Sequence, residues 1–205
     1  PQTLQEAAGV LLGAWRKAAG SGASNEGSVL PLFEAAFTLV ERHYSTLAKV
    51  SAQTAVPFVE LAAVACESAS QRVCESSFGI ISELGLLAEE DDPCMADVGS
   101  VSPYVVRALL GIRRHTTLTC EEDAEALHDF REQASLALLG VHKAIGVQAT
   151  QILFDLAMKS GAAGNIYDTE ATLFCLTSFA EELGDKESDA IVDNIVAPLV
   201  ANTSL

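Results

Sequence analysis

Hydrophobic residues recur along almost the whole chain at helical spacing, three or four positions apart, and no segment keeps the strict alternation of a half-buried strand. The clearest stripe is formed by Leu32, Phe33, Ala36, Phe37, Val40 and Tyr44. This period predicts helices over about 4–19, 29–50, 54–67, 70–90, 103–114, 124–145, 148–159, 167–184 and 187–201. We therefore expect an all-α protein.

Polar, proline and glycine residues mark several predicted boundaries. Ser102 and Pro103 have the order of an N-cap and a first-turn proline, so we expect a helix to begin there. Pro93 is expected to end the preceding helix. Asp168 is placed to cap the helix that follows the loop at 160–165, and Gly184 to end it.

Phenylalanine marks alternate predicted helices, at Phe33, Phe78, Phe130 and Phe174. A repeat of roughly 40–47 residues with two helices per unit is typical of HEAT and armadillo arrays. The longest gap contains an acidic loop at 121–125. We therefore favour an α-solenoid of about four HEAT-like antiparallel helix pairs over a bundle or a globin-like pack. The approximate units are 1–27, 28–67, 68–116, 117–161 and 162–205.

Charge narrows the classes of partner. The 205 residues include 12 basic and 28 acidic side chains, which gives a formal net charge of −16. Phosphate backbones and anionic membranes repel such a surface, so we expect neither direct nucleic-acid binding nor membrane binding. A strongly acidic surface attracts basic partners. The alternative is that the acidic residues only keep an apolar chain in solution.

Five scattered cysteines, at positions 66, 74, 94, 120 and 175, form no CxxC pair. Their odd number and apolar surroundings predict reduced core thiols in a cytosolic or nuclear protein. No signal peptide and no apolar run of about 18 residues is visible. Because the chain begins with Pro1 rather than Met, we expect it to be a piece of a longer protein.

Patterns typical of catalysis or of cofactor binding do not stand out. The histidines at positions 43, 115, 128 and 142 lack the spacing of a helical zinc site, so surface or capping roles are expected. The glycine-rich stretch 20–27 lacks the lysine of a phosphate-binding loop. No serine lies in a GxSxG motif. We expect no enzyme activity, no metal and no cofactor.

Acidic clusters are the remaining candidates for a functional surface. The residues concerned are Glu89, Glu90, Asp91, Asp92, Glu121, Glu122, Asp123, Glu125, Glu181, Glu182 and Asp185. Solvated loops explain each cluster simply, whereas a concave acidic wall would attract basic segments of a partner. For Arg107, Arg113 and Arg114 we favour helix-dipole compensation and ion pairs with neighbouring acids.

Four blocks in order resemble a known family. "GAWRKAAGSGASNEGSVLPLFEAAFTLVERHYSTL", "ASQRVCESSFGIISELG", "DFREQASLALLGVHKAIG" and "YDTEATLFCLTSFAEEL" are similar to segments of importin-β-type nuclear transport receptors, in the transportin-3 and importin-13 branch. In the last block Glu170, Ala171, Leu173 and Phe174 match the family pattern, while Tyr167 stands where the family usually has Trp.

The resemblance implies a middle segment of a longer HEAT solenoid that shuttles between cytoplasm and nucleus. It implies basic protein cargo, including Arg-Ser-rich segments, and Ran-GTP as partners of the intact receptor, with nucleoporins as further candidates. Two alternatives remain: a HEAT scaffold or adaptor of the phosphatase-regulatory or coat-adaptor type, and a cryptic helical enzyme or small-molecule-binding bundle.

Overall fold

The computed structural model describes residues 52–89, 98–117 and 124–197, together with isolated positions between 6 and 38. Every regular element in these ranges is a helix, which confirms the all-α prediction for the described part. The elements are α3 (Ala52–Cys66), α4 (Gln71–Glu75), α5 (Phe78–Glu89), α6 (Val98–His115), α7 (Ala124–Ile145), α8 (Val147–Ala162), α9 (Ile166–Thr177), the 3₁₀ turn η3 (Ala180–Glu182), α10 (Asp185–Ile191) and the π-helical turn η4 (Val192–Val196).

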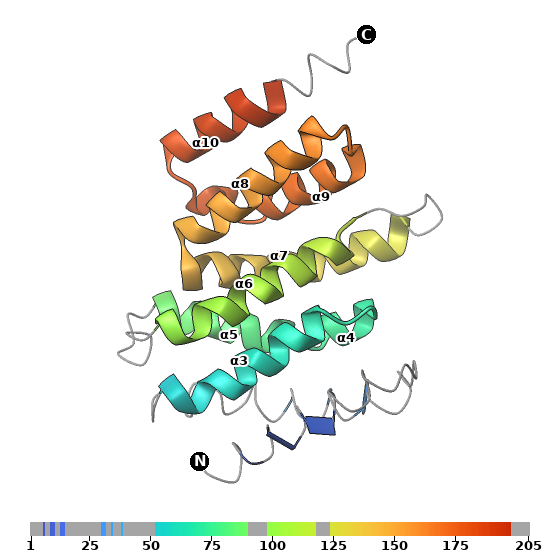
Figure 1. Ribbon diagram of the computed structural model, residues 1–205, viewed down its shortest axis with the longest axis vertical. Coiled ribbons are helices and arrows are strands. Elements are labelled where there is room, and N and C mark those ends of the chain that lie inside the picture. Colours follow the sequence, from blue (N-terminus) through green and yellow to red (C-terminus); the bar gives the residue numbers. More distant parts are fainter. Residues whose placement is uncertain are drawn as a thin grey trace.

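The helices follow one another along the long axis of the molecule in chain order, from α3 to α10 (Figure 1). In that view α3, α6 and α8 lie nearer the viewer, and α5, α7 and α9 lie behind them. The most extensive contacts join α5 to α7 and α3 to α6, and α8 packs on α9. These contacting helices thus lie one to three elements apart in the chain.

Two of the repeated phenylalanines meet in the core. The rings of Phe78 in α5 and Phe130 in α7 are 5.6 Å apart, and both side chains are buried. Farther along the same two helices, Gly85 faces Gly140. Because both contacts advance in the same chain direction, α5 and α7 run parallel. Phe33 lies outside the described residues.

Glycine allows two of the helix crossings to be very close. A Cβ added to Gly111 of α6 would stand 2.5 Å from the carbonyl oxygen of Cys66 at the end of α3. A Cβ added to Gly140 of α7 would stand 2.5 Å from the carbonyl oxygen of Ile81 in α5. Real Cβ atoms do not approach backbone this closely, so only glycine fits these positions.

The predictions for the helices over 70–90 and 103–114 are wrong in one respect each. The helix expected over 70–90 is broken into α4 and α5, and the Ser77 hydroxyl donates to the carbonyl of Cys74 at 2.6 Å beside the break. The helix expected to begin at Ser102 begins at Val98 instead, so Pro103 lies inside α6. Ser102 is therefore not the N-cap of this helix, and its hydroxyl donates to Gln148 Oε1 of α8 at 3.0 Å.

The helix expected to end at Gly184 ends at Thr177, and its cap is Asn165 rather than Asp168. The side-chain oxygen of Asn165 accepts from the backbone N–H of Asp168 at 3.2 Å. The hydroxyls of Thr177 and Ser178 both donate to the carbonyl of Phe174 at the other end. Gly184 precedes α10 instead, and its carbonyl accepts from the N–H of Ser188.

The early end of α9 changes one position of its apolar stripe. A continuous helix over 167–184 predicts a core face of Leu173, Leu176, Ala180 and Leu183, with Phe174 and Phe179 beside it. Leu176 and Phe179 are buried, and Leu173, Phe174 and Leu183 are partly buried against the core, whereas Ala180 is exposed; Ala171 and Cys175 are buried in addition. The α-helical period stops at Thr177, so Ala180 does not lie on the face that a continuous helix would bury.

Other expectations concern the thiols, the last helix and membrane spans. Cys66, Cys74 and Cys175 are buried free thiols, as predicted, whereas Cys94 and Cys120 lie outside the described residues.

The last predicted helix begins two residues early, at Asp185, and becomes π-helical from Val192. Among the described helices none is long and apolar enough to cross a membrane alone, although α7 and α8, bent by 118° at their junction, pass that test when taken together.

Candidate partner-binding surface

The described candidate acids lie at two places on the molecule. Glu125 is exposed in the first turn of α7. Glu181 and Glu182 are exposed in η3, and Asp185 is exposed at the start of α10. Backbone alone is described for Glu89, the last residue of α5. Glu90, Asp91, Asp92, Glu121, Glu122 and Asp123 lie outside the described residues.

These two places are on opposite edges of the stack. Arg131 of α7 pairs with Glu170 of α9, and His142 of α7 stacks on Phe179 just beyond α9. Helices α7 and α9 therefore run in the same direction, and the start of α7 is far from the end of α9. At about 1.5 Å per residue, Glu125 lies roughly 25 Å along α7 from the level of His142. The structure does not bring Glu125 together with the acids of η3.

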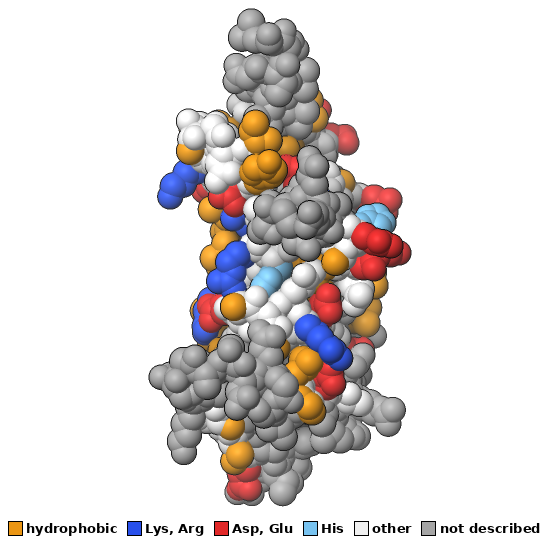
Figure 2. All heavy atoms as spheres, turned by 90° about the vertical axis from the view of Figure 1, so that its right-hand side faces the viewer, with side chains coloured by type: hydrophobic (Ala, Val, Ile, Leu, Met, Phe, Trp, Pro, Cys, Tyr) orange, Lys and Arg blue, Asp and Glu red, His pale blue; other side chains and the backbone are white. Residues whose placement is uncertain are grey.

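The edge where α7 begins carries more acidic residues than the sequence analysis identified. Asp129 and Glu132 are exposed on α7 together with Glu125. Figure 2 shows acidic side chains gathered around an exposed histidine at this edge. Positions 125, 129 and 132 are spaced i, i+4 and i+7, so helical periodicity could have identified this stripe from the sequence.

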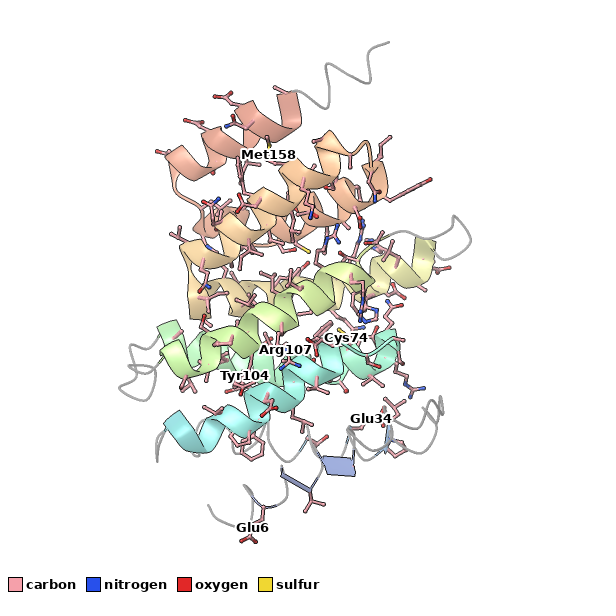
Figure 3. The ribbon with its side chains drawn as sticks, viewed as in Figure 1. Glu6, Glu34, Cys74, Tyr104, Arg107 and Met158 are labelled. Atoms are coloured by element: carbon pink, nitrogen blue, oxygen red, sulfur yellow. The ribbon has the colours of Figure 1, made fainter. Side chains whose placement is uncertain are left out.

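Much of the positive charge of the described residues is used inside the molecule. Arg107 of α6 forms a two-pronged pair with Glu67, from Nε to Oε1 at 2.8 Å and from Nη2 to Oε2 at 2.6 Å. Arg107 and Tyr104 both lie on α6, and the Arg107 guanidinium stands 5.9 Å from the Tyr104 ring centroid (Figure 3). The hydrogen bond from Arg107 lowers the pKa of Glu67, and the same bond raises the pKa of Arg107.

Side chains at the C-terminal end of α6 contact backbone carbonyls just after the end of α3. Arg114 Nη2 donates to the carbonyl oxygens of Glu67 and Ser68 at 2.7 and 2.8 Å. His115 Nε2 is 2.9 Å from the same Ser68 oxygen, and its ring contacts Phe130. Burial lowers the pKa of His115. The ion pairs expected from the sequence are confirmed for Arg107 with Glu67 and for Arg113 with Asp168, and Arg114 satisfies carbonyls at the end of α3.

Two further arginines reach α9. Arg113 Nη2 is 2.8 Å from Asp168 Oδ1, and Arg113 Nε donates to Thr172 Oγ1 at 3.0 Å. Arg131 Nη1 donates to Glu170 Oε1 at 2.6 Å, and its guanidinium lies 4.8 Å from the Phe174 ring centroid. Both arginine side chains are mostly buried. These two arginines are therefore engaged within the molecule, whereas the acids of α7, η3 and α10 named above are exposed.

The described residues bring together no group of three histidine, cysteine or acidic side chains that could hold a metal ion. The buried thiols are poor nucleophiles, because burial raises the pKa of Cys175 to about 12, and a hydrogen bond with Cys66 together with burial raises that of Cys74.

Comparisons of the chain with protein-family models, with curated proteins and with solved structures find no significant match.

Proposed function

We propose that this chain is a HEAT-type solenoid segment of a nuclear transport receptor that binds basic protein partners through its exposed acidic edges. The architectural half of the proposal is supported by the order of helices along the long axis and by the parallel packing of α5 with α7. A stack in which each helix contacts mainly its neighbours is the arrangement expected of helical repeats.

The two layers suggest a repeating unit made of one helix from each layer (Figure 1). On this basis α3 pairs with α4 and α5, α6 with α7, and α8 with α9, while the more extensive α3–α6 and α5–α7 contacts join successive units. These pairs are offset by one helix from the unit boundaries predicted from the sequence. The rings of Phe78 and Phe130 and the guanidinium–ring contact at Phe174 then fall in equivalent second helices.

One observation carries the binding half of the proposal. Arg107, Arg113, Arg114 and Arg131 are engaged with acids or carbonyls of the same molecule, whereas acidic side chains of α7, η3 and α10 face solvent. These four arginines are therefore not available to neutralise the exposed acids of those edges. Such a surface attracts basic segments and repels nucleic acid.

The resemblance to the transportin-3 and importin-13 branch narrows the partner to basic cargo, including Arg-Ser-rich segments. It also suggests a secondary contact with Ran-GTP, contacts with nucleoporins and shuttling between cytoplasm and nucleus. Binding rather than chemistry is the proposed mechanism, with many weak ionic contacts adding up over a long surface.

Titration of the chain with a fluorescent peptide of alternating arginine and serine tests this function. We expect saturable binding that weakens several-fold between about 50 and about 200 mM salt, because screening removes contacts between exposed charges. A peptide of alternating glutamate and serine is the matched control and should not bind. Equal binding of the two peptides, or no binding of the basic one, would overturn the proposal.

The alternative is a HEAT scaffold or adaptor with no transport role, which the same architecture would suit. Ran distinguishes the two readings when it is presented to the intact protein in its GTP-bound and GDP-bound forms. A receptor should prefer the GTP-bound form. A scaffold should show no preference while still binding its own partner.

A further inference from the structure

The helices from α3 to α7 pack on one another differently from the way they pack on the helices that follow. We call α3 to α7 the first block, and α8, α9, η3, α10 and η4 the second block. Inside the first block the helices meet at glycines, and a Cβ added to Gly111 or Gly140 would stand 2.5 Å from a carbonyl of the neighbouring helix. Backbone therefore lies directly against backbone, and the helices have little room to move against each other.

Between the blocks, polar side chains bond helix to helix beside a hydrophobic core that runs through both blocks. Arg113 of α6 holds Asp168 and Thr172 of α9, and Arg131 of α7 holds Glu170. A third bridge runs from the Ser102 hydroxyl of α6 to Gln148 Oε1 of α8, at 3.0 Å. The apolar contact at this interface includes the stacked rings of His142 and Phe179, with centroids 4.5 Å apart.

Most buried polar residues of the described part belong to the second block. In the described part the buried polar residues are Ser77, Thr116, Thr150, Ser160, Thr169 and Thr172. Thr116 and Thr172 lie where the blocks meet, since the Thr116 hydroxyl is 3.8 Å from Cys175 Sγ and Thr172 accepts from Arg113, whereas Ser160 and Thr169 bond to each other within the second block. Thr150 Oγ1 has no hydrogen-bond partner in the structure. Polar interfaces between parts of one chain usually permit relative motion.

The chain crosses from the first block to the second through a single residue. Gly146 separates α7 from α8, and the two helices are bent by 118° there. Its φ of 54° is a conformation that other residues rarely adopt, although an added Cβ would meet no atom within 4 Å. Glycine is thus needed at this position for its backbone conformation and not for close packing.

We infer that Gly146 is a joint about which the second block pivots on the first, and that Arg113 and Arg131 form the latch that holds the closed arrangement. The first block, whose helices interlock at glycines, moves as one body. When the latch opens, α9 separates from the ends of α6 and α7 while the α8–α9 pair stays intact. This device would let the stack change its curvature at one defined place, whatever partner the surface binds.

Amide hydrogen exchange of the whole chain tests the latch. In an Arg113→Gln/Arg131→Gln variant we expect α8 and α9 to exchange about tenfold faster, while α3 and α5 change less than about twofold. Arg107→Gln is the control, because it removes a two-pronged ion pair within the first block; it should leave α8 and α9 unchanged. Uniform acceleration of all helices in the double variant would overturn the inference.

A second experiment measures distances across the joint with Arg113 and Arg131 left unchanged. Spin labels carried by a ketone-bearing amino acid in place of Leu86 and Ala162 span the joint, and labels in place of Leu86 and His128 lie within the first block. All three positions are exposed. We expect a broader distance distribution across the joint than within the block. Equal widths for the two pairs would contradict a joint at Gly146.

Discussion

Gly85 of α5 and Gly140 of α7 lie so close together that a Cβ added to Gly85 would overlap the Cα of Gly140. The backbones of the two helices are in contact at this point, and the Phe78–Phe130 ring contact fixes their register farther back. This crossing fixes how α5 and α7 pack. Any side chain larger than hydrogen must force the helices apart.

Gly140→Ala should therefore lower the free energy of unfolding by about 1–3 kcal/mol, the usual range for overpacking a close core contact. Urea unfolding followed by circular dichroism measures the change. The matched control is Gly161→Ala in α8, where an added Cβ meets no atom within 4 Å. That change should be neutral or stabilising by up to about 1 kcal/mol, because alanine favours the helix. A neutral Gly140→Ala would mean that the two helices are not in backbone contact.

Phe130 occupies the centre of the described core, with rings of Phe78 and His115 beside it. Phe130→Ala should destabilise the fold by about 3–5 kcal/mol, through lost burial and the cavity left behind. Leu136→Ala on the same helix is the control, since Leu136 is 68% exposed; its effect should stay within about 0.5 kcal/mol. Similar effects of the two changes in thermal unfolding would refute the assigned face of α7.

Asn165 begins α9 by accepting from the N–H of Asp168, and its own amide donates to the Asp168 carboxylate at 2.8 Å. Asn165→Ala should cost about 1 kcal/mol of stability, the typical value for a lost N-cap. Asn165→Ser retains an uncharged capping acceptor and should retain part of that stability. If the serine variant is no more stable than the alanine variant, the cap does not operate as described.

His115 should make stability depend on pH. Burial lowers its pKa below the ordinary value of 6.5, so the folded protein holds the neutral form while the unfolded chain still binds a proton near that value. The contribution of His115 is therefore fully present above pH 6.5 and is lost as the pH falls from there toward its folded pKa. Urea midpoints from pH 8 to pH 5 should fall more steeply for the wild-type chain than for His115→Asn. Parallel pH profiles would exclude His115 as the source.

Predictions from the sequence succeeded where a helix has a long, unbroken apolar period. The bounds of α7 agree with those predicted, because the pattern continues from Ala124 to Ile145 without a competing polar residue on the buried face. They failed where side chains compete with the backbone for hydrogen bonds. The hydroxyls of Thr177 and Ser178 bond to Phe174 and accompany the end of α9, and Gly184 farther on looked like the better stop.

The surface was predictable only in its composition. The exposure of Glu125, Glu181 and Glu182 follows from their polar surroundings, but their separation depends on the direction of α7 relative to α9. That direction is set by contacts between residues far apart in the chain, such as Arg131 with Glu170. No local pattern encodes those partners, so the two acidic edges could not be distinguished before the fold was known.

Charge reversal at the two edges tests the binding surface most directly. One variant combines Glu125→Lys, Asp129→Lys and Glu132→Lys in the first turns of α7. The other variant combines Glu181→Lys and Glu182→Lys in η3 with Asp185→Lys at the start of α10. The two variants change the net charge equally. We expect each to weaken binding of the arginine–serine peptide by about tenfold or more, because opposite charges at a contact are replaced by like charges. Undiminished binding by both variants, with the fold intact by circular dichroism, would contradict the proposal that these acidic edges bind basic partners.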